Sequence, residues 1–313
     1  MKLHIIVNPA AGHGRSLALL PRLTDRFAEA GAEYEILQTT APMDARVMAR
    51  DACIRGSGGI IGIGGDGTLQ EVVAGMREAF PGESHIPTPL GILPCGSGND
   101  FALTFTNGKK NESFDSCADN IINGKMNLLD LIRVNGNLKC QASGQVITES
   151  MCLNIANIGL DARIVQNAAA LKKRFGKHAY LAAAYKSIAR HKNVPLRVET
   201  DGGVIEGDFT LIAVCNGQYY GGGLRISPEA RLDDGLITVC LIDGIGRLKT
   251  MVLFPSILFE KHTRLKFVRY KTCKRLTVNV RDGEVLCVDG NLYDCSGSVS
   301  FALMPAAIKL FTL

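Results

Sequence analysis

Residues Gly59–Gly75 read GIIGIGGDGTLQEVVAG, and this stretch decides the fold of the first part of the chain. Ile60–Ile63 is rich in β-branched residues, which favour a strand that is buried on both faces. The strand is followed by three glycines, Gly64, Gly65 and Gly67. We expect these glycines to permit positive φ angles and to let a phosphate approach the backbone closely.

A helix is predicted to begin at Thr68, because Thr68 and Glu71 have the spacing of a capping box. The apolar positions that follow recur as on one buried helix face: Leu69, Val72, Val73 and Met76. Free N–H groups at a helix start attract anions. Asp66 lies among them and would repel a bare phosphate, but it could hold Mg²⁺ beside one. The alternative is an ordinary strand-to-helix turn with a surface aspartate.

Strands and helices alternate through the first 130 residues, which favours a parallel sheet covered by helices on both faces. The predicted strands are Leu3–Val7, Tyr34–Leu37, the strand before Gly64 and Leu90–Leu93, with helices from about Ser16 to Ala30 and Pro42 to Arg55. Loops at the carboxyl ends of such strands line the ligand crevice.

After about Met126 the pattern changes to short alternating segments, which predict antiparallel β structure in a β-sandwich or a partly open barrel. The candidate strands are Leu128–Val134, Met151–Ala156, Leu196–Glu199, Thr210–Cys215, Leu236–Ile242, Arg275–Val280, Val285–Val288 and Val299–Leu303. One helical insertion is expected at Asp161–Arg190. We therefore predict two domains, residues 1–130 joined by the C-terminal segment 304–313, and residues 131–303.

Composition narrows the class of protein. The chain has 313 residues, a net charge of +5 and ten cysteines without a CxxC pair. The charge is too small to favour nucleic acid, and no nucleic-acid-binding signature accompanies it. Neither a signal peptide nor an apolar run long enough to span a bilayer is apparent. These features predict a reduced, cytoplasmic protein without a zinc site or a disulfide framework.

Two further loops follow predicted strands. Pro94–Ala102 reads PCGSGNDFA, in which Gly96 and Gly98 again favour phosphate approach and Asp100 supplies a second carboxylate. Asn8–Gly14 reads NPAAGHG and follows the first strand. The alternative for Asn8–Gly14 is a simple loop.

Together these segments resemble the diacylglycerol kinase catalytic-domain family, and the likeness runs nearly end to end. The matching residues are GGDGT at Gly64–Thr68 with Glu71, Asn8, Pro9 and Gly12 of an N-P-x-x-G loop, and Gly96, Ser97, Gly98 and Asn99 of a P-x-G-T-x-N-D-F-A segment. Ser97 replaces the usual threonine and keeps the hydroxyl. The resemblance implies that these residues bind ATP, with the active site between an α/β domain and a β-sandwich domain.

The resemblance also implies two Mg²⁺ sites. In the first, Asp66 and Asp130 hold Mg²⁺ through water; a buried aspartate in an apolar strand needs a cation or several donors. The alternative for Asp130 is a carboxylate paired with Arg133 or a lysine. In the second, structural site, the ligands are Asp234 and the carbonyls of Arg231 and Leu236. Composition alone indicates an Asp-Asp-Gly hairpin turn there.

Val288–Asn291 reads VDGN where the family has D-G-E, and the resemblance implies that Asp289 is the general base for the acceptor hydroxyl. Asn291 departs from the usual glutamate. A second Asp-Gly-Glu at Asp282–Glu284 is interpreted as a hairpin turn between two strands. Asn154–Ala162 and Asn216–Gly223 resemble segments beside the acceptor cleft.

The resulting prediction is an ATP- and Mg²⁺-dependent lipid kinase with catalytic residues Asp66, Asp100, Asp130 and Asp289. Diacylglycerol is the leading acceptor, with phosphatidic acid as the product; sphingoid bases, ceramide, phosphatidylglycerol and an undecaprenyl-like alcohol remain open. A soluble-substrate kinase of the NAD kinase type and a catalytically silent lipid- or nucleotide-binding protein are the alternatives. A homodimer is possible.

Basic residues concentrate in the second half of the chain, and a run of this kind is either a solvated face or an attraction to anionic lipid. They are Lys172, Lys173, Arg174, Lys177, Arg190, Lys192, Lys261, Arg264, Lys266, Arg269, Lys271, Lys274 and Arg275. The second interpretation predicts peripheral association with a membrane surface, where the lipid substrate lies.

Overall fold

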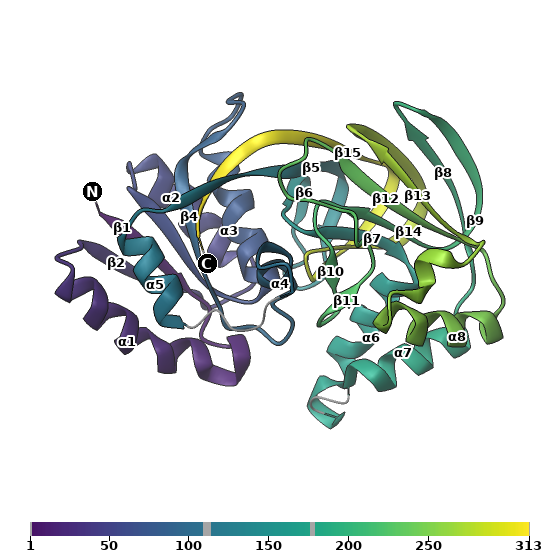
Figure 1. The fold of residues 1–313 in the computed structure, drawn as a ribbon, viewed down its shortest axis with the longest axis horizontal. Helices are drawn as coiled ribbons and strands as arrows, with labels where there is room; N and C mark the ends of the chain where they lie inside the picture. The colour runs from purple at the N-terminus through teal and green to yellow at the C-terminus, as the bar shows by residue number, and fades with distance from the viewer. Residues whose placement is uncertain (1, 109–113, 176–178, 313) are drawn as a thin grey trace. The chain divides into compact units, whose positions relative to one another are not determined.

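The computed structural model describes residues 2–108, 114–175 and 179–312, which group into two compact units (Figure 1). Unit 1 comprises Met1–Leu131, Leu232–Gly235 and Met304–Leu313, and unit 2 comprises Ile132–Arg231 and Leu236–Leu303. The placement of Leu232–Gly235 in unit 1 was not expected from the sequence. The side chains of the basic run Lys172–Lys177 lie outside the described part of the chain.

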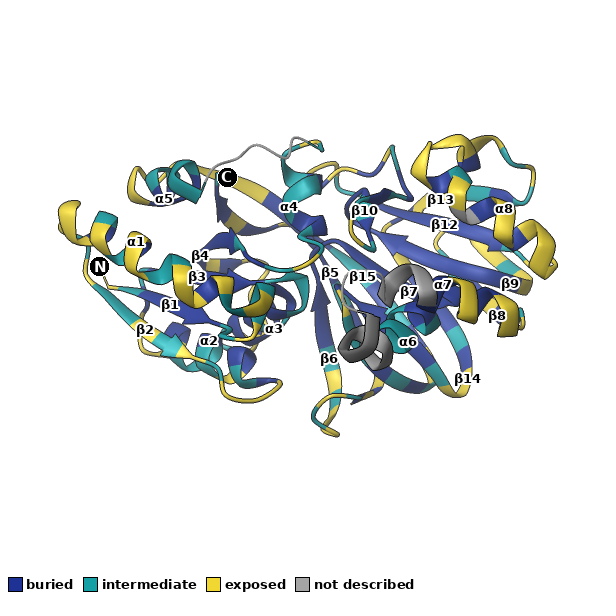
Figure 2. Ribbon diagram, turned by 90° about the horizontal axis from the view of Figure 1, so that it is seen from below, coloured by how far each residue is buried: buried dark blue, intermediate teal, exposed yellow. Residues whose placement is uncertain are grey.

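Unit 1 contains a parallel sheet in the order β15-β4-β3-β1-β2. Its strands are β1 (Leu3–Val7), β2 (Tyr34–Gln38), β3 (Gly59–Gly64), β4 (Ile86–Pro94) and the end of β15 (Asn291–Phe311). Ile5 of β1 lies between Ile36 of β2 and Ile61 of β3. Every residue of β3 is buried, as the isoleucine-rich run predicts, and β3 is dark blue in Figure 2.

The helices of unit 1 are η1 (Ala11–Gly14), α1 (Arg15–Glu29), α2 (Asp44–Ile54), α3 (Asp66–Glu78), α4 (Asp100–Phe105) and α5 (Phe114–Ile122). α2 packs against α3, and α1 packs against α5. β2 lies on one side of β1, and the next two strands, β3 and β4, are added on the other side of β1. Right-handed crossovers then place α1 on one face and α2 and α3 on the other.

The predicted start of α3 is wrong. The helix begins at Asp66 with Gly65 as its N-cap, and no side chain caps it. Thr68 instead accepts a hydrogen bond from Asn8 Nδ2 at 2.9 Å. Glu71 accepts hydrogen bonds from the backbone of Met43 and Ala45 at the start of α2. The capping-box residues therefore join α3 to its neighbours, whereas the apolar face predicted for this helix is buried.

Unit 2 is rich in antiparallel strands, in the order β13-β12-β9-β7-β14-β15. They are β6 (Val146–Cys152), β7 (Ile155–Gly159), β8 (Val194–Thr200), β9 (Gly203–Cys215), β12 (Ile237–Asp243), β13 (Val268–Cys273) and β14 (Arg275–Val288). β8 pairs with β9 and β14, and β5 (Met126–Cys140) runs from unit 1 into unit 2 and pairs with β6. A separate hairpin consists of β10 (Tyr219–Tyr220) and β11 (Leu224–Arg225).

Helices α6 (Leu160–Phe175), α7 (Ala179–Arg190) and α8 (Arg247–Leu258), with the short η3 (Lys261–Arg264), complete unit 2. Their buried residues share one core with the strands: Ile164 of α6, Ile188 of α7 and Leu253 of α8 belong to the cluster that contains Leu211 and Cys240. All ten cysteines are free and buried.

Three sequence predictions for unit 2 need correction. The strand predicted at Met151–Ala156 is broken at residues 153 and 154, between β6 and β7. The single helical insertion is two helices, α6 and α7. Asp282–Glu284 is no hairpin turn, because β14 continues through it with a shift of register between Val280 and Glu284. The physical cause of the last error is that a bulge and a turn both use Asp-Gly.

Candidate active site

Three loops meet at the carboxyl ends of neighbouring parallel strands in unit 1. They follow β1, β3 and β4, and each packs backbone against backbone. A Cβ on Gly12 would lie 2.1 Å from the carbonyl oxygen of Cys95, and a Cβ on Gly96 would lie 2.5 Å from the Cα of Gly65. These glycines are therefore required by the close approach of the loops to one another.

The role predicted for Gly64, Gly65 and Gly67 is only partly right. None of them needs a positive φ: Gly64 ends strand β3, Gly65 has a φ of −98°, and Gly67 lies inside α3. The positive φ angles in these loops belong to Gly12 at 58°, His13 at 59°, Gly14 at 91° and Asn99 at 56°. Gly64 instead makes room for Thr68, whose Cβ would lie 2.6 Å from an added Cβ.

Asp66 joins the second loop to the third. Its Oδ1 accepts a hydrogen bond from the backbone N–H of Phe101 at 2.9 Å, and its Oδ2 accepts one from Asp100 at 3.2 Å. Both donors lie in the first turn of α4. The side chain of Asn99 completes the loop by accepting a hydrogen bond from the N–H of Gly96 at 2.7 Å. These hydrogen bonds tie the second loop to the third.

The Asp66 and Asp100 carboxylates approach the same point beside Gly98. An added Cβ on Gly98 would lie 2.9 Å from Asp100 Oδ2 and 3.4 Å from Asp66 Oδ2. Burial raises the pKa of Asp66 above its ordinary value, although the N–H groups of Phe101 and Asp100 lower it. A carboxylate pair of this kind is stabilised by a cation, because a nearby positive charge favours the ionised forms.

Among the described residues, no group of three or more histidine, cysteine, aspartate or glutamate side chains is arranged to hold a metal ion. Mg²⁺ does not require one, since it keeps several waters and is commonly bound through one or two carboxylates and substrate phosphates. The Asp66–Asp100 pair fits that donor set. Exposed Ser97 and the N–H groups at the start of α3 lie in the same loops.

Asp130 is buried and has backbone donors. Its Oδ2 accepts a hydrogen bond from the N–H of Gly235 at 2.8 Å, and its Oδ1 accepts one from Ala306 at 2.7 Å. Arg133, which was considered as a partner of Asp130, has its Nε 3.7 Å from Oε2 of Glu149. Asp130 thus holds two remote segments of unit 1 to β5, and its predicted part in a water-linked metal network stays a prediction.

The segment predicted to bind a structural Mg²⁺ has an exposed Asp234 beside Gly235, the residue bound by Asp130. It is not a hairpin turn between paired strands, because β11 before it pairs with β10 and β12 after it pairs with β9 and β13. The ligand roles of Arg231, Asp234 and Leu236 stay predictions.

Asp289 occupies a hairpin turn that sequence reasoning did not recognise. Val288 of β14 pairs with Asn291 of β15, so Asp289 and Gly290 form a two-residue turn. Their φ angles are 46° and 90°, and a type I′ turn requires positive values at both positions. The Asp-Gly dipeptide between two apolar runs was the available signal.

The Asp289 carboxylate accepts three backbone hydrogen bonds at the break between β6 and β7. The donors are Leu153 at 2.7 Å, Asn154 at 3.0 Å and Ile155 at 2.9 Å. Leu153 and Asn154 lie between β6 and β7, and Ile155 is the first residue of β7. Asp289 therefore has a structural part in unit 2 besides the catalytic one predicted for it.

A further carboxylate, Asp161, was not singled out as a site residue. It lies in the first turn of α6 and is 2% exposed. Burial raises the pKa of Asp161 to about 7, although the nearby Tyr220 hydroxyl lowers it. The two segments predicted to lie beside the acceptor cleft are joined to each other by hydrogen bonds. Asn154 Nδ2 donates to the carbonyl of Tyr219 at 2.6 Å, and Asn216 Nδ2 donates to the carbonyl of Leu153 at 2.7 Å.

Comparison with known proteins agrees with this arrangement. The family model of the diacylglycerol kinase catalytic domain matches residues 2–134, and that of the YegS C-terminal NAD kinase beta sandwich-like domain matches residues 154–312. A diacylglycerol kinase of Mycobacterium tuberculosis (strain CDC 1551 / Oshkosh) is 29% identical over 99% of this chain and 94% of the relative. A diacylglycerol kinase of Bacillus subtilis (strain 168) is 28% identical over 92% of this chain and 89% of the relative.

Solved structures share the fold. Two from Bacillus anthracis strain Sterne superimpose with TM-scores of 0.75 and 0.69, at 24% and 22% identity, over 100% of this chain and 97% of each relative. The second is titled a diacylglycerol kinase.

The fold and its matches define a two-domain lipid kinase whose C-terminal domain is rich in β structure. The chain belongs to the diacylglycerol kinase catalytic-domain family. In the part of the chain that the structure describes, no helix has both the length and the apolar character needed to cross a membrane.

Proposed function

We propose that this protein transfers the γ-phosphate of ATP to the hydroxyl of a lipid, and that the lipid is diacylglycerol, which becomes phosphatidic acid. The observation that carries the proposal is that three loops meet at the carboxyl ends of β1, β3 and β4, beside the Asp66 and Asp100 carboxylates. The names of the curated relatives supply the choice of acceptor.

The nucleotide phosphates are assigned to the three loops. The N–H groups at the start of α3 would attract a phosphate oxygen. Asp66 and Asp100 would hold Mg²⁺, which supplies neutralisation of the phosphate charge. The hydrogen bonds from Phe101 and Asp100 keep the Asp66 carboxylate oriented before the nucleotide arrives.

The acceptor proton is assigned to Asp289. In the proposed reaction the lipid hydroxyl oxygen bonds to the γ-phosphorus, and the bond from that phosphorus to the bridging oxygen of ADP breaks. The hydroxyl proton passes to the Asp289 carboxylate. The three backbone donors at Leu153, Asn154 and Ile155 fix the direction of that carboxylate.

Transfer of labelled γ-phosphate from Mg·ATP into diacylglycerol and into a total lipid extract, both in mixed micelles, tests the proposal. We expect labelled phosphatidic acid from the wild-type protein, and a loss of about a hundredfold or more in turnover for Asp66→Asn and for Asp289→Asn. Thermal melting of each variant separates lost catalysis from lost folding.

Asp282→Asn is the matched control, because it changes a second Asp-Gly pair, Asp282–Gly283, which lies exposed in the bulge of β14. It should retain full turnover. Loss of activity in this variant with retention in Asp289→Asn would move the base to the bulge. Label in a water-soluble acceptor alone would favour a kinase of the NAD kinase type.

A further inference from the structure

Helix α8 is apolar on its exposed side as well as on its buried side. Leu253 and Ile257 face the core of unit 2 and are each 2% exposed. The opposite side and the residue that follows the helix carry five large apolar side chains open to solvent: Leu248, Met251, Val252, Leu258 and Phe259. Leu248, Val252 and Phe259 are 82%, 70% and 71% exposed.

These five residues make one surface. Positions 248, 251 and 252 have the spacing of a single helix face, and 258 and 259 continue it about two turns after 251 and 252. Figure 2 shows α8 as a largely exposed element at the edge of unit 2. Single exposed apolar residues are ordinary, but five of the fifteen large ones in the described part of the chain fall within this twelve-residue stretch. A concentration of this kind marks an interaction surface.

Exposed cations flank the apolar residues of α8 in the sequence. Arg247 and Lys249 lie at the start of α8, and Lys261, Arg264 and Lys266 follow it; all five are exposed. The one acidic residue between positions 247 and 266 is Glu260. Arg225 binds Glu260 through its Nη1, 3.2 Å from both carboxylate oxygens. The surface therefore has five cations, and its single carboxylate is already neutralised.

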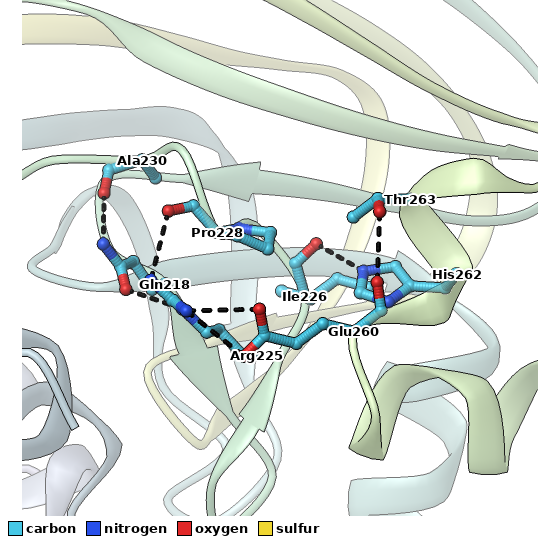
Figure 3. Close-up of polar contacts among 8 residues, drawn as sticks. All are labelled: Gln218, Arg225, Ile226, Pro228, Ala230, Glu260, His262 and Thr263. Atoms are coloured by element: carbon cyan, nitrogen blue, oxygen red, sulfur yellow. Dashed lines mark hydrogen bonds and ion pairs between the residues drawn. The ribbon is translucent and has the colours of Figure 1, made fainter.

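The surface is held firmly to the rest of unit 2, as Figure 3 shows. Arg225 donates from Nε to Gln218 at 2.9 Å while it binds Glu260, so it bridges the β10–β11 hairpin and the end of α8. Buried His262 donates from Nε2 to the carbonyl of Ile226 at 3.0 Å. An apolar helix fixed in place with its face open is ready to bind without a prior rearrangement.

We propose that the exposed face of α8, with the cations from Arg247 to Lys266, docks on an anionic membrane surface. The apolar side chains enter the boundary between headgroups and acyl chains, and the cations bind lipid phosphates. A second copy of the chain fits less well, because a two-fold contact would bring the same cations together without counter-charges. The proposal rests on the proposed lipid kinase function for its purpose, since the enzyme must reach a substrate in a bilayer.

Vesicle co-sedimentation without ATP tests the docking surface. Wild-type protein should sediment with vesicles of equal parts phosphatidylcholine and phosphatidylglycerol, and far less with phosphatidylcholine alone. Leu248→Ser/Val252→Ser/Phe259→Ser should lower the partition coefficient at least tenfold. Each change from Arg247→Gln, Lys249→Gln or Lys261→Gln should lower it about fivefold at low salt.

The matched control is Val146→Ser/Val204→Ser, which removes two other exposed apolar side chains of unit 2, 63% and 53% exposed, from strands β6 and β9. It should bind as the wild type does. Equal binding by the triple serine variant, or no sedimentation of the wild type, overturns the proposal. So does a wild-type dimer in light scattering that becomes a monomer in the triple variant, because the surface would then bind a second copy.

The two proposals fail separately. Vesicle binding requires no turnover, so docking through α8 without any phosphorylated lipid refutes the kinase assignment and leaves the docking surface standing. Conversely, the triple serine variant should keep wild-type turnover on a short-chain, monomeric diacylglycerol. Loss of activity on that acceptor would place α8 in the catalytic machinery instead.

Discussion

Buried carboxylates dominate the polar chemistry of this protein at the residue scale, and each is treated differently by its surroundings. Asp289 and Asp130 receive backbone N–H donors. Asp66 receives donors and still has a raised pKa, because its burial outweighs them. Asp161 has a buried oxygen, Oδ2, without a hydrogen-bond partner, and its pKa rises to about 7.

The raised pKa of Asp161 predicts a pH-dependent stability. The folded state holds the proton up to about pH 7, whereas the unfolded chain releases it near the ordinary value of 3.8. Stability is therefore greatest at low pH in this window and falls as pH rises from about 4 to about 7. The free energy of unfolding of Asp161→Asn relative to wild type should rise by up to about 4 kcal/mol over that range.

Urea unfolding at a series of pH values measures this difference. Asp208→Asn, at an exposed carboxylate of β9, is the control and should show no such trend. A difference for Asp161→Asn that does not change with pH would show that Asp161 stays ionised in the folded protein.

At the scale of secondary-structure elements, glycine allows the backbones of two elements to pack in direct contact. An added Cβ on Gly75 would lie 1.9 Å from the carbonyl oxygen of Arg46, so α3 and α2 pack without a side chain between them. The hydrophobic periodicity of α3 predicted its buried face correctly. That periodicity could not explain why position 75 is a glycine, because the reason is the contact with α2, about thirty residues earlier in the chain.

Gly75→Ala should destabilise unit 1 despite the better helix propensity of alanine. The gain from propensity is about 1 kcal/mol, but the added methyl group must displace the α2 backbone. We expect a net loss of about 2 kcal/mol or more in urea unfolding. Gly207→Ala in β9 is the control, since its nearest contact would be 3.9 Å from Phe209, and it should change stability little. A stabilised Gly75→Ala variant would contradict the helix contact.

At the scale of the whole molecule, Asp130 of β5 joins two segments that are remote in the sequence, one at Leu232–Gly235 and one at Ala306. Its carboxylate binds the N–H groups of Gly235 and Ala306, and its own N–H donates to the carbonyl of Leu232 at 2.7 Å. This is why Leu232–Gly235 belongs to unit 1 although its neighbours on both sides belong to unit 2. The sequence marked Asp130 as a costly buried charge but could not supply its partners.

Asp130→Asn should lower the free energy of unfolding by about 2–3 kcal/mol, because an amide cannot accept both hydrogen bonds. If the carboxylate acts through the backbone alone, the loss is equal in Mg²⁺ and in EDTA. A loss seen only in Mg²⁺ would instead assign Asp130 to a metal site. Asp233→Asn, at an exposed carboxylate of the same loop, should melt as the wild type does.

The sequence by itself determined the alternating strands and helices of unit 1, the β-rich second unit, the three glycine loops and the family, because periodicity, turn chemistry and motif spacing are local properties. Only the tertiary structure decided what the residues of those motifs contact. The capping-box residues Thr68 and Glu71 bind other elements, Asp289 forms a hairpin turn against the β6–β7 break, and α8 leaves an apolar face open. The physical reason is that a buried polar group takes whichever donor the fold brings near, and its position in the sequence does not encode that donor.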